Sequence, residues 1–96
     1  MPWAGQQLMH YVYILLLTNG QLYTGCTNDL RRRYKEHKQG LVKSTKNKVK
    51  KMIHYEAYSL TVDAVRRERY LKTTAGKKML RKQIKNILIK ENVINE

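Results

Sequence analysis

The chain has 96 residues, a length typical of one small domain with a modest core. The chain has twenty Lys and Arg residues and seven Asp and Glu residues, which give a formal net charge of +13. The sequence has no apolar stretch of about 18 residues that would predict a membrane span, and its start resembles no signal peptide. The single cysteine, Cys26, excludes an intramolecular disulfide and suits a reducing cytoplasm.

The positive charge is concentrated in one part of the chain. All twenty basic residues lie between Arg31 and Lys90, and residues 31–51 hold ten of them beside a single acid, Glu36. A field of this density favours a polyanionic partner, most simply nucleic acid, over a generally basic surface. Contacts to phosphate carry no base information, so the charge predicts no sequence specificity.

The first half of the chain contains three predicted strands and one helix. Residues 1–9 are expected to form a loose extension, and residues 10–17 and 21–27 are rich in strand-forming residues. Asn19-Gly20 between them is a strong hairpin signal. A helix is predicted from a cap at Thr27 or Asn28 to about Gln39, with Gly40 as its end. A basic loop over 41–50 and a third strand over 51–58 follow.

Two helices are predicted in the second half. The first spans about 62–73 after a cap at Ser59 or Thr61. Residues 73–76 interrupt the helical pattern, a last helix covers about 77–90, and residues 92–96 form a tail. The order β-β-α-β-α-α with its hairpin predicts an α+β fold, a small three-stranded antiparallel sheet flanked by helices. We expect it to form one domain over residues 10–91.

An arginine and a histidine fall beside the apolar stripe of the first helix. The stripe has i, i+3, i+4, i+7 spacing and comprises Leu30, Arg33, Tyr34, His37 and Leu41. Arg33 could lie along the apolar surface, and His37 could be a satisfied core residue. Both could instead be directed at a phosphate, and spacing alone does not separate the two interpretations.

Glu68 falls among the apolar positions of the second helix, whereas the basic residues of that helix are predicted mostly on its outer side. An inward carboxylate needs a partner. The partner could be Arg67 or Lys72 in an ion pair, or a magnesium or manganese ion that also binds water and substrate phosphate. His10 and His54 lack companions at zinc-ligand spacing, and Cys26 is interpreted as a small buried residue.

Several short motifs occur together. Tyr11-Val12-Tyr13 is followed by Tyr23-Thr24-Gly25, and then by Arg33, His37 and Glu68. From about Tyr11 to Leu80 this pattern resembles the GIY-YIG nuclease superfamily. The stretches TNDLRRRYKEH, VKSTK, YEAY and RRERYLKT resemble the small stand-alone proteins of the UPF0213 type.

The resemblance implies hydrolysis of phosphodiester bonds in DNA with one Mg²⁺ or Mn²⁺ ion. It makes Tyr13 and Tyr23 the active-site tyrosines, Arg33 the catalytic arginine and Glu68 the metal ligand. His37 stands at a position that the family fills with His or Tyr. The chain departs from the pattern at Tyr11, Thr24 and Cys26, the last standing where DNA-repair members have a lysine. It also has no asparagine between Asn47 and Asn86.

The expected chemistry assigns a role to each of these residues. Arg33 would stabilise the charge of the transition state, and Tyr13 would act as a phenolate base made accessible by the metal and Arg33. Tyr23 and His37 would orient the water or the leaving group. Contacts to the nucleic-acid backbone are predicted for seven further residues, Arg31, Arg32, Lys43, Lys46, Lys48, Lys50 and Lys51.

Two other classes of function are compatible with the same residues. One is a nucleic-acid-binding module that keeps the fold and lacks catalysis. The other is a basic structural or ribosome-associated protein, which leaves the placement of Glu68 without a reason. The expected nuclease would recognise a nick, flap or junction, or RNA, more readily than a base sequence, could act in repair or recombination, and could work with a protein partner.

The length of the hairpin turn decides whether the two tyrosines share a site. A two-residue turn would place the Tyr13 and Tyr23 phenols on opposite faces of the sheet. A three-residue turn, Thr18–Gly20 with a left-handed Gly20, would place Tyr13 opposite Gly25 and both phenols on one face. Gly25 would then leave space beside Tyr13 for a phosphate. A shared site therefore predicts an odd-length turn.

Overall fold

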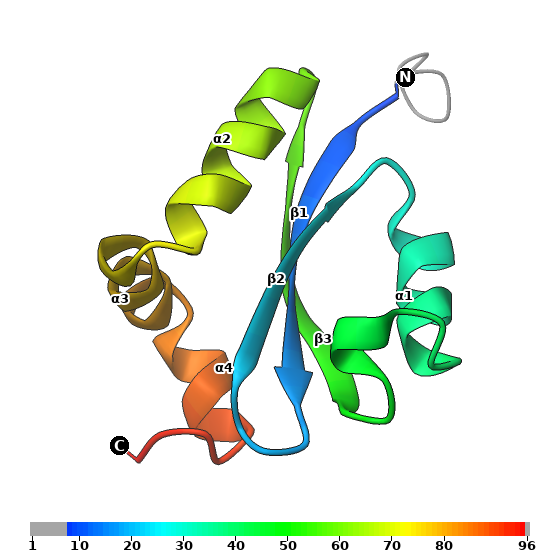
Figure 1. Ribbon diagram of the computed structural model, residues 1–96. Helices are drawn as coiled ribbons and strands as arrows, with labels where there is room; N and C mark the ends of the chain where they lie inside the picture. Colours follow the sequence, from blue (N-terminus) through cyan, green and yellow to red (C-terminus); the bar gives the residue numbers. More distant parts are fainter. Residues whose placement is uncertain (1–7, 96) are drawn as a thin grey trace, which may run out of the picture.

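A three-stranded antiparallel sheet runs through the middle of the molecule, with helices on both sides (Figure 1). The computed structural model describes residues 8–95, so most of the predicted extension 1–9 lies outside the described residues. Within 8–95, no helix is long and apolar enough to cross a membrane. The predicted α+β class and three-stranded antiparallel sheet are confirmed, and so is the element order up to a division of the last helix.

The hairpin strands β1 (His10–Leu17) and β2 (Leu22–Thr27) agree with the prediction closely, and β1 is the central strand. The third strand, β3 (Val49–Tyr58), pairs with the other edge of β1 and starts two positions earlier than predicted. The predicted basic loop over 41–50 is therefore shorter. All β1 residues from Val12 to Leu17 are buried, because helices cover both faces of the sheet.

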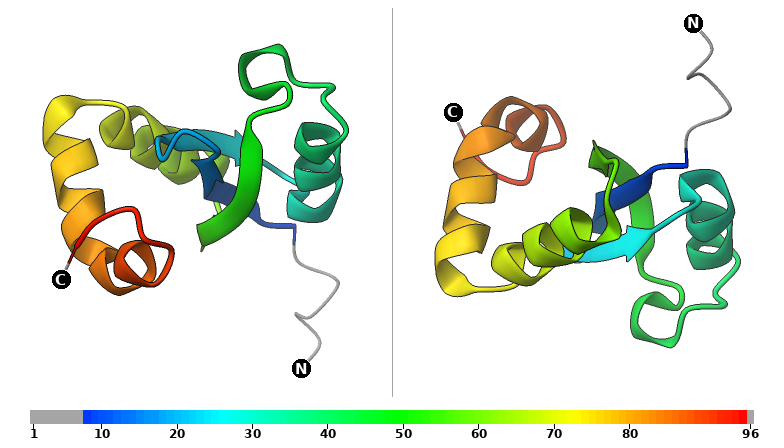
Figure 2. Two further views of the ribbon diagram at one scale, coloured as in Figure 1. Left: turned by 90° about the horizontal axis from the view of Figure 1, so that it is seen from below. Right: turned by 90° about the horizontal axis from the view of Figure 1, so that it is seen from above.

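The two faces of β1 belong to two separate hydrophobic clusters. Val12 and Ile14 point to the cluster under the later helices, whereas Tyr13, Leu15 and Leu17 point to the opposite one. Figure 2 shows this division, with α2, α3 and α4 on one side of the sheet and α1 on the other. Any side chain of β1 is therefore assigned to one helical layer by its position in the strand.

The turn between β1 and β2 has three residues, Thr18–Gly20. Gly20 has a φ of +86°, the left-handed conformation of a G1 bulge. The register pairs Tyr13 with Gly25 and places Tyr23 on the same face as Tyr13. The odd-length turn that a shared site requires is thus confirmed, and the two-residue alternative is wrong.

Helix α1 (Leu30–Lys38) and the short 3-10 turn η1 (Lys43–Thr45) cover the Tyr13 face. The Asp29 carboxylate caps α1 by accepting a hydrogen bond from the Arg32 amide at 3.0 Å. The helix begins at Leu30 because this carboxylate satisfies one of its free amide groups. The predicted caps, Thr27 and Asn28, are wrong by one or two residues.

The end of α1 was predicted correctly, but the apolar stripe is shorter than the spacing indicates. Gly40 follows the helix with a φ of +76°, and its amide donates to the His37 carbonyl. Leu41, predicted to continue the stripe, is 69% exposed. The chain has already turned away at Gly40, so the helical periodicity no longer applies there.

The opposite face is covered by α2 (Thr61–Leu71), α3 (Thr74–Gln83) and α4 (Lys85–Lys90). The single helix predicted over 77–90 is therefore present as two consecutive helices, divided at Ile84. The N-cap of helix α2 is Leu60, so the caps predicted at Ser59 or Thr61 are wrong by one residue. The core under these helices includes Leu80, Ile84 and Leu88. Val93 and Ile94, in the predicted tail, also pack against it.

The interruption predicted at 73–76 is the first turn of α3. The Thr73 hydroxyl caps the helix by accepting a hydrogen bond from the Gly76 amide at 3.0 Å. A Cβ at Gly76 would overlap the Tyr70 carbonyl. Helix α3 can therefore start directly after α2, because glycine permits this close approach of the two backbones.

Candidate active site

Gly25 makes room for the ring of Tyr13, which lies against it from the neighbouring strand. A Cβ at residue 25 would overlap the Tyr13 ring and its hydroxyl. We expected Gly25 to leave space beside Tyr13 for a phosphate. That expectation is wrong, because the phenol itself occupies this space. Gly25 instead allows the Tyr13 hydroxyl to lie over β2, the outer strand on this side of the sheet.

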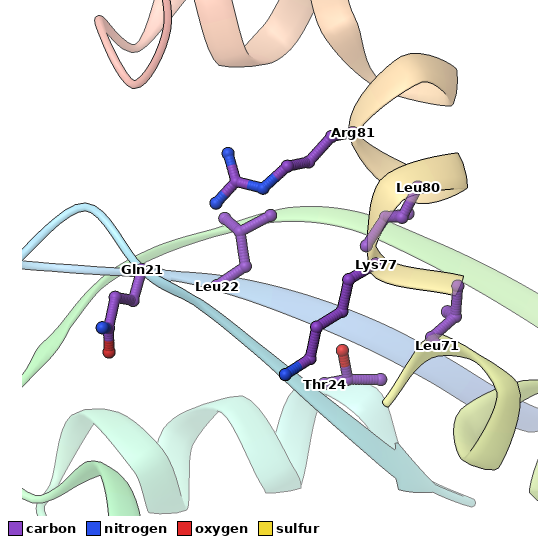
Figure 3. Close-up of a pocket in the computed structure, with 7 residues that line it drawn as sticks. All are labelled: Gln21, Leu22, Thr24, Leu71, Lys77, Leu80 and Arg81. Atoms are coloured by element: carbon purple, nitrogen blue, oxygen red, sulfur yellow. The ribbon is translucent and has the colours of Figure 1, made fainter. Parts of the chain in front are cut away.

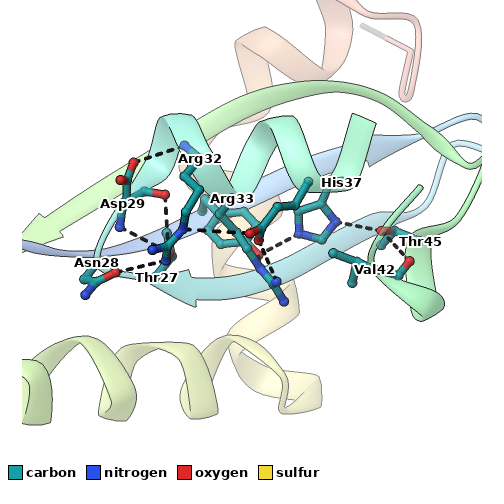
Figure 4. A network of polar contacts seen from close by, with 10 residues as sticks. Thr27, Asn28, Asp29, Arg32, Arg33, His37, Val42 and Thr45 are labelled. Carbon is teal, nitrogen blue, oxygen red and sulfur yellow. Dashed lines mark hydrogen bonds and ion pairs between the residues drawn. The ribbon is translucent and has the colours of Figure 1, made fainter. Parts of the chain in front are cut away.

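The Tyr13 hydroxyl begins a chain of hydrogen bonds. It lies 2.8 Å from His37 Nε2. On the other side of the ring, His37 Nδ1 lies 2.6 Å from the Thr45 hydroxyl oxygen (Figure 4). The Thr45 hydroxyl donates to the Val42 carbonyl at 3.5 Å. Because a carbonyl can only accept, this network assigns the imidazole proton to Nδ1 and leaves Nε2 to accept the Tyr13 proton.

Burial determines the protonation states of this chain. His37 is 1% exposed, and burial together with the positive charge of Arg33 lowers the pKa of the imidazole below 6.5. Burial also raises the pKa of the Tyr13 phenol above 10.0, and the hydrogen bond from Arg33 offsets only part of that rise. Arg33 thus lowers the pKa of Tyr13 in the expected direction, but by itself it does not outweigh burial. Tyr13 is a phenol beside a neutral imidazole.

Arg33 connects this chain to the surface. Its Nε donates to the Tyr13 hydroxyl at 3.4 Å, and its Nη1 pairs with Glu36 at 3.1 Å. About a third of the side chain remains exposed. Arg33 and His37 lie on one side of α1, as their spacing predicts, and both contact the Tyr13 hydroxyl. The guanidinium is thus held beside Tyr13 with part of its surface open to a ligand.

The Tyr23 ring packs beside the rings of Tyr13 and His37. Its ring centroid lies 5.3 Å from that of His37 and 6.4 Å from that of Tyr13. Among residues 8–95, no side chain or backbone group is hydrogen-bonded to the Tyr23 hydroxyl, and this hydroxyl is available to a ligand. The two phenols and the imidazole therefore share one site, as the turn length requires.

Glu68 approaches from α2 on the other side of the sheet. Its side chain is 22% exposed and its carboxylate pairs with Lys72 Nζ at 3.3 Å. Lys72 is therefore the partner, and Arg67, the other predicted ion-pair partner, bonds elsewhere. After burial, the charge of Glu68 contributes to raised pKa values of both Tyr13 and Cys26. The carboxylate thus acts at the β2 edge, near the Tyr13 cluster but without a hydrogen bond to it.

Glu68 is an isolated carboxylate. Within residues 8–95, no group of three or more His, Cys, Asp or Glu side chains is placed to hold a metal ion. A metal at Glu68 would therefore have one protein carboxylate, with water and substrate as its other ligands. This donor set fits Mg²⁺ or Mn²⁺, which keep several waters, and does not fit a structural zinc site. The exposed ammonium of Lys72 can be displaced by such an ion.

A second polar cluster, not predicted from the sequence, lies on the opposite face of the sheet. Glu56 on β3 accepts hydrogen bonds from Arg67 at 2.9 and 3.2 Å, from Tyr58 at 2.7 Å and from His54 at 3.0 Å. Burial opposes ionisation of Glu56, but these bonds lower its pKa to about 2. Burial and the bond to Glu56 raise the pKa of Tyr58 to about 12. We call these four residues the Glu56 cluster.

Sequence reasoning missed Thr45 and the Glu56 cluster. Thr45 lies in a stretch that looked like an exposed basic loop, yet it is fully buried under His37. Arg67 was expected mostly on the outer side of α2, but its side chain is only 27% exposed. The strand alternation of His54, Glu56 and Tyr58 was a usable signal, since residues two apart share a face.

The seven predicted nucleic-acid contacts are exposed side chains of α1, of η1 and of the residues that follow it into β3. Two of the seven are partly engaged by carboxylates, Arg32 with Glu36 at 3.9 Å and Lys51 with Glu91 at 2.9 Å. Among the described residues, the other five have no carboxylate partner, namely Arg31, Lys43, Lys46, Lys48 and Lys50. The role of all seven in binding stays a prediction.

Comparison with known proteins places this constellation in a family. Residues 9–82 match the family model described as the GIY-YIG catalytic domain. This match covers most of the chain and all of the cluster around Tyr13, together with Glu68. The chain therefore belongs to the GIY-YIG family, whose model describes a nuclease-type catalytic domain.

Individual relatives narrow the assignment. A UPF0213 protein from Bacillus licheniformis is 36% identical over 70 residues, covering 71% of this chain and 72% of that protein. A UPF0213 protein from Staphylococcus aureus strain Mu3 is 36% identical over 74 residues, covering 75% and 90%. The solution NMR structure of a UPF0213 protein from Bacillus halodurans aligns with a TM-score of 0.50 and 34% identity, covering 76% and 82%. Within the GIY-YIG family, the chain is a member of the UPF0213 group.

Proposed function

We propose that this protein is a divalent-metal-dependent endonuclease that hydrolyses phosphodiester bonds in nucleic acid, DNA first. The observation that carries the proposal is the Tyr13 hydroxyl, held between the Arg33 guanidinium and a neutral His37 imidazole. The half-buried Glu68 carboxylate reaches the same edge of the sheet. A cation, a proton acceptor and a potential metal ligand thus meet beside β2.

Glu68 would hold the metal ion, with Lys72 moving away as the ion binds. When bound, the metal would reduce the charge on the phosphate and lower the pKa of a coordinated water. Arg33 stays in place and directs its exposed edge at the phosphate, where it stabilises the charge that develops on the phosphoryl oxygens.

Tyr13 and His37 would remove the proton from the attacking water. The water oxygen forms a bond to phosphorus, and the bond from phosphorus to the leaving oxygen breaks. The Tyr13 oxygen takes the water proton while its own proton passes to His37 Nε2 across the 2.8 Å hydrogen bond. This path needs no phenolate in the resting protein. A neutral imidazole is required, and burial of His37 keeps it neutral at pH 7.

Tyr23 and the basic surface would position the substrate. The free Tyr23 hydroxyl can bind the water or a phosphate oxygen beside the cluster. Exposed cations from α1 to the first residues of β3, Arg31, Arg32, Lys43, Lys46, Lys48, Lys50 and Lys51, would hold the strand by its phosphates. Such contacts favour recognition of nucleic-acid structure, such as a nick, flap or junction, over base sequence. This mode of binding suits repair or recombination in the cytoplasm.

The deciding experiment is a cleavage panel of labelled DNA and RNA structures with Mg²⁺ and with Mn²⁺. We expect wild type to cut at least one substrate only with metal, and Glu68→Gln to bind it equally without cutting. Asp63→Asn is the matched control, because Asp63 is an exposed carboxylate on the same helix and pairs with Arg66. Equal loss of cleavage in both variants, or metal-independent cleavage by wild type, would contradict the proposal.

A second candidate is a nucleic-acid-binding module without catalysis. The observation that favours it is the ion pair between Glu68 and Lys72, which satisfies the carboxylate without a metal. This candidate predicts tight binding, no cleavage under any metal, and no change in binding when Mg²⁺ is added. Metal-dependent cleavage that is lost in Glu68→Gln would exclude it.

A further inference from the structure

A pocket of about 270 Å³ lies between β2 and α3, next to the candidate active site. Its lining residues are Gln21, Leu22, Thr24, Leu71, Lys77, Leu80 and Arg81. Figure 3 shows Lys77 and Arg81 extending from α3 across the pocket toward β2, Lys77 toward Thr24 and Arg81 toward Leu22. The polar groups of the pocket thus come from two elements that are far apart in the sequence.

The residues that line the pocket include two cations, Lys77 and Arg81, and no Asp or Glu. Lys77 and Arg81 are four residues apart, so they project from one side of α3. Within residues 8–95, neither side chain forms an ion pair or a hydrogen bond with another side chain. The Thr24 hydroxyl and the Gln21 amide add hydrogen-bond donors. A hollow lined by cations of one sign concentrates its field and attracts an anion.

The pocket and the candidate active site are neighbours along β2. Thr24 directly precedes Gly25, over which the Tyr13 ring lies, and Leu71 directly precedes Lys72, the partner of Glu68. From Gly25 to Gln21 the strand extends about 13 Å at its usual rise per residue. A nucleic-acid strand whose phosphate lies at Arg33 therefore passes over this pocket if it follows the β2 edge.

We propose that Lys77 and Arg81 form a second phosphate-binding subsite, which holds a phosphodiester of the substrate strand next to the bond that is cleaved. This inference rests on the proposed nucleic-acid substrate. The apolar floor of Leu22, Leu71 and Leu80 suits a sugar of the same nucleotide. The strand would then be held from both sides of the sheet, by the α1 surface and by α3, with the cleaved bond over β2.

Helix α3 itself provides the matched control. Lys78 and Lys82 have the same four-residue spacing and are also exposed, but they do not line the pocket. Binding is measured without divalent metal, so that no cleavage occurs. For a duplex, we expect Lys77→Ala/Arg81→Ala to reduce the slope of log affinity against log salt by about 1.8, two phosphate contacts at about 0.9 each. Its affinity should fall about tenfold or more. Lys78→Ala/Lys82→Ala should change both much less.

A strand with single phosphates replaced by uncharged methylphosphonate locates the contact. We expect one position beside the cleaved bond to weaken binding to wild type and to the control variant, but not to Lys77→Ala/Arg81→Ala. The proposal is wrong if the two double variants lose affinity and salt slope equally. It is also wrong if the pocket variant loses as much affinity for a mononucleotide as for the strand, which would assign the pocket to free nucleotides.

This outcome is separable from that of the proposed function. The cleavage panel tests Glu68 and the metal, and it does not involve α3. If the protein binds strands through Lys77 and Arg81 but never cuts them, the subsite proposal stands and the endonuclease proposal is wrong. If the protein cuts with metal but both double variants bind equally well, the endonuclease proposal stands and the subsite proposal is wrong.

Discussion

Two polar clusters on opposite faces of the sheet use the same kinds of residue and differ in where the carboxylate lies. In the Glu56 cluster, the carboxylate bonds directly to an arginine, a tyrosine and a histidine. Around Tyr13, the arginine and the histidine bond to the phenol, while Glu68 stands apart with an exposed lysine. In the first arrangement the carboxylate is fully bonded within the protein. In the second, Arg33 and Glu68 are partly exposed and can contact a ligand.

Residue type alone therefore does not identify an active site in this fold. Four charge-assisted bonds stabilise the ionised Glu56 so strongly that its pKa falls to about 2, and a metal or substrate would have to break them. Glu68 has one exposed partner, and displacing it costs little. The number of bonds that the carboxylate makes within the protein therefore distinguishes a stabilising network from a candidate site.

The largest expected effect is on cleavage. Tyr13→Phe removes the hydroxyl that links Arg33 to His37, and we expect the cleavage rate to fall about 10² to 10⁴-fold, the usual contribution of a proton-transfer group. Tyr58→Phe is the control in the other cluster, and it should leave the rate per folded molecule unchanged. Single-turnover cleavage with excess enzyme measures both. A Tyr58→Phe defect as large as that of Tyr13→Phe would remove the distinction between the clusters.

Stability should show the reverse order. Glu56→Gln leaves Arg67 without its carboxylate, and we expect a loss of about 3 kcal/mol of unfolding free energy, at the low end for a broken buried pair. Glu68→Gln breaks only the pair with Lys72 and should cost less than about 0.5 kcal/mol. Urea denaturation compares them. Equal losses would mean that Glu68 is as much a structural residue as Glu56.

A methyl group at Gly25 tests the packing of the open cluster. Gly25→Ala should destabilise the fold by about 1–3 kcal/mol, because the new Cβ displaces the Tyr13 ring. In a Tyr13→Ala background the ring is absent, and the same change should cost almost nothing. A double-mutant cycle of unfolding free energies measures this coupling. Additive costs would show that the ring does not depend on the space at Gly25.

The loss of stability on acidification should begin at different pH values in the two clusters. The folded pKa of His37 is lowered from 6.5, so its contribution is present above pH 6.5 and is lost as the pH falls through the folded pKa. Glu56 contributes above pH 4.5 and loses its contribution as the pH falls through about 2. Unfolding of wild type, His37→Gln and Glu56→Gln across pH 2–8 separates them. A His37→Gln curve parallel to wild type between pH 4.5 and 7 would contradict the neutral imidazole.

Local signals made much of this protein predictable. Strand alternation and the Asn19-Gly20 signal located the hairpin, and Gly40 marked the end of α1. Helical spacing placed Arg33 beside His37 and turned Glu68 away from solvent. These features depend on residues within a few positions of each other, where backbone geometry alone fixes the neighbours.

Contacts between distant segments were beyond these signals. The split of the last helix at Ile84 and the close approach of α3 to Tyr70 follow from how three short helices cover one sheet face. Thr45 looked like part of a solvated loop, because its burial depends on α1 lying above it. The pocket of Lys77 and Arg81 likewise exists only because α3 packs beside β2.

By itself, the sequence determined the strands of the sheet, its strong positive charge and the local spacing of the site residues. It left open whether the phenols share a face, which partner satisfies Glu68, and what fills the space at Gly25. The tertiary structure decided all three, through a three-residue turn, an ion pair with Lys72 and the Tyr13 ring. The physical reason is that spacing sets direction along one element, whereas packing between elements sets which groups meet.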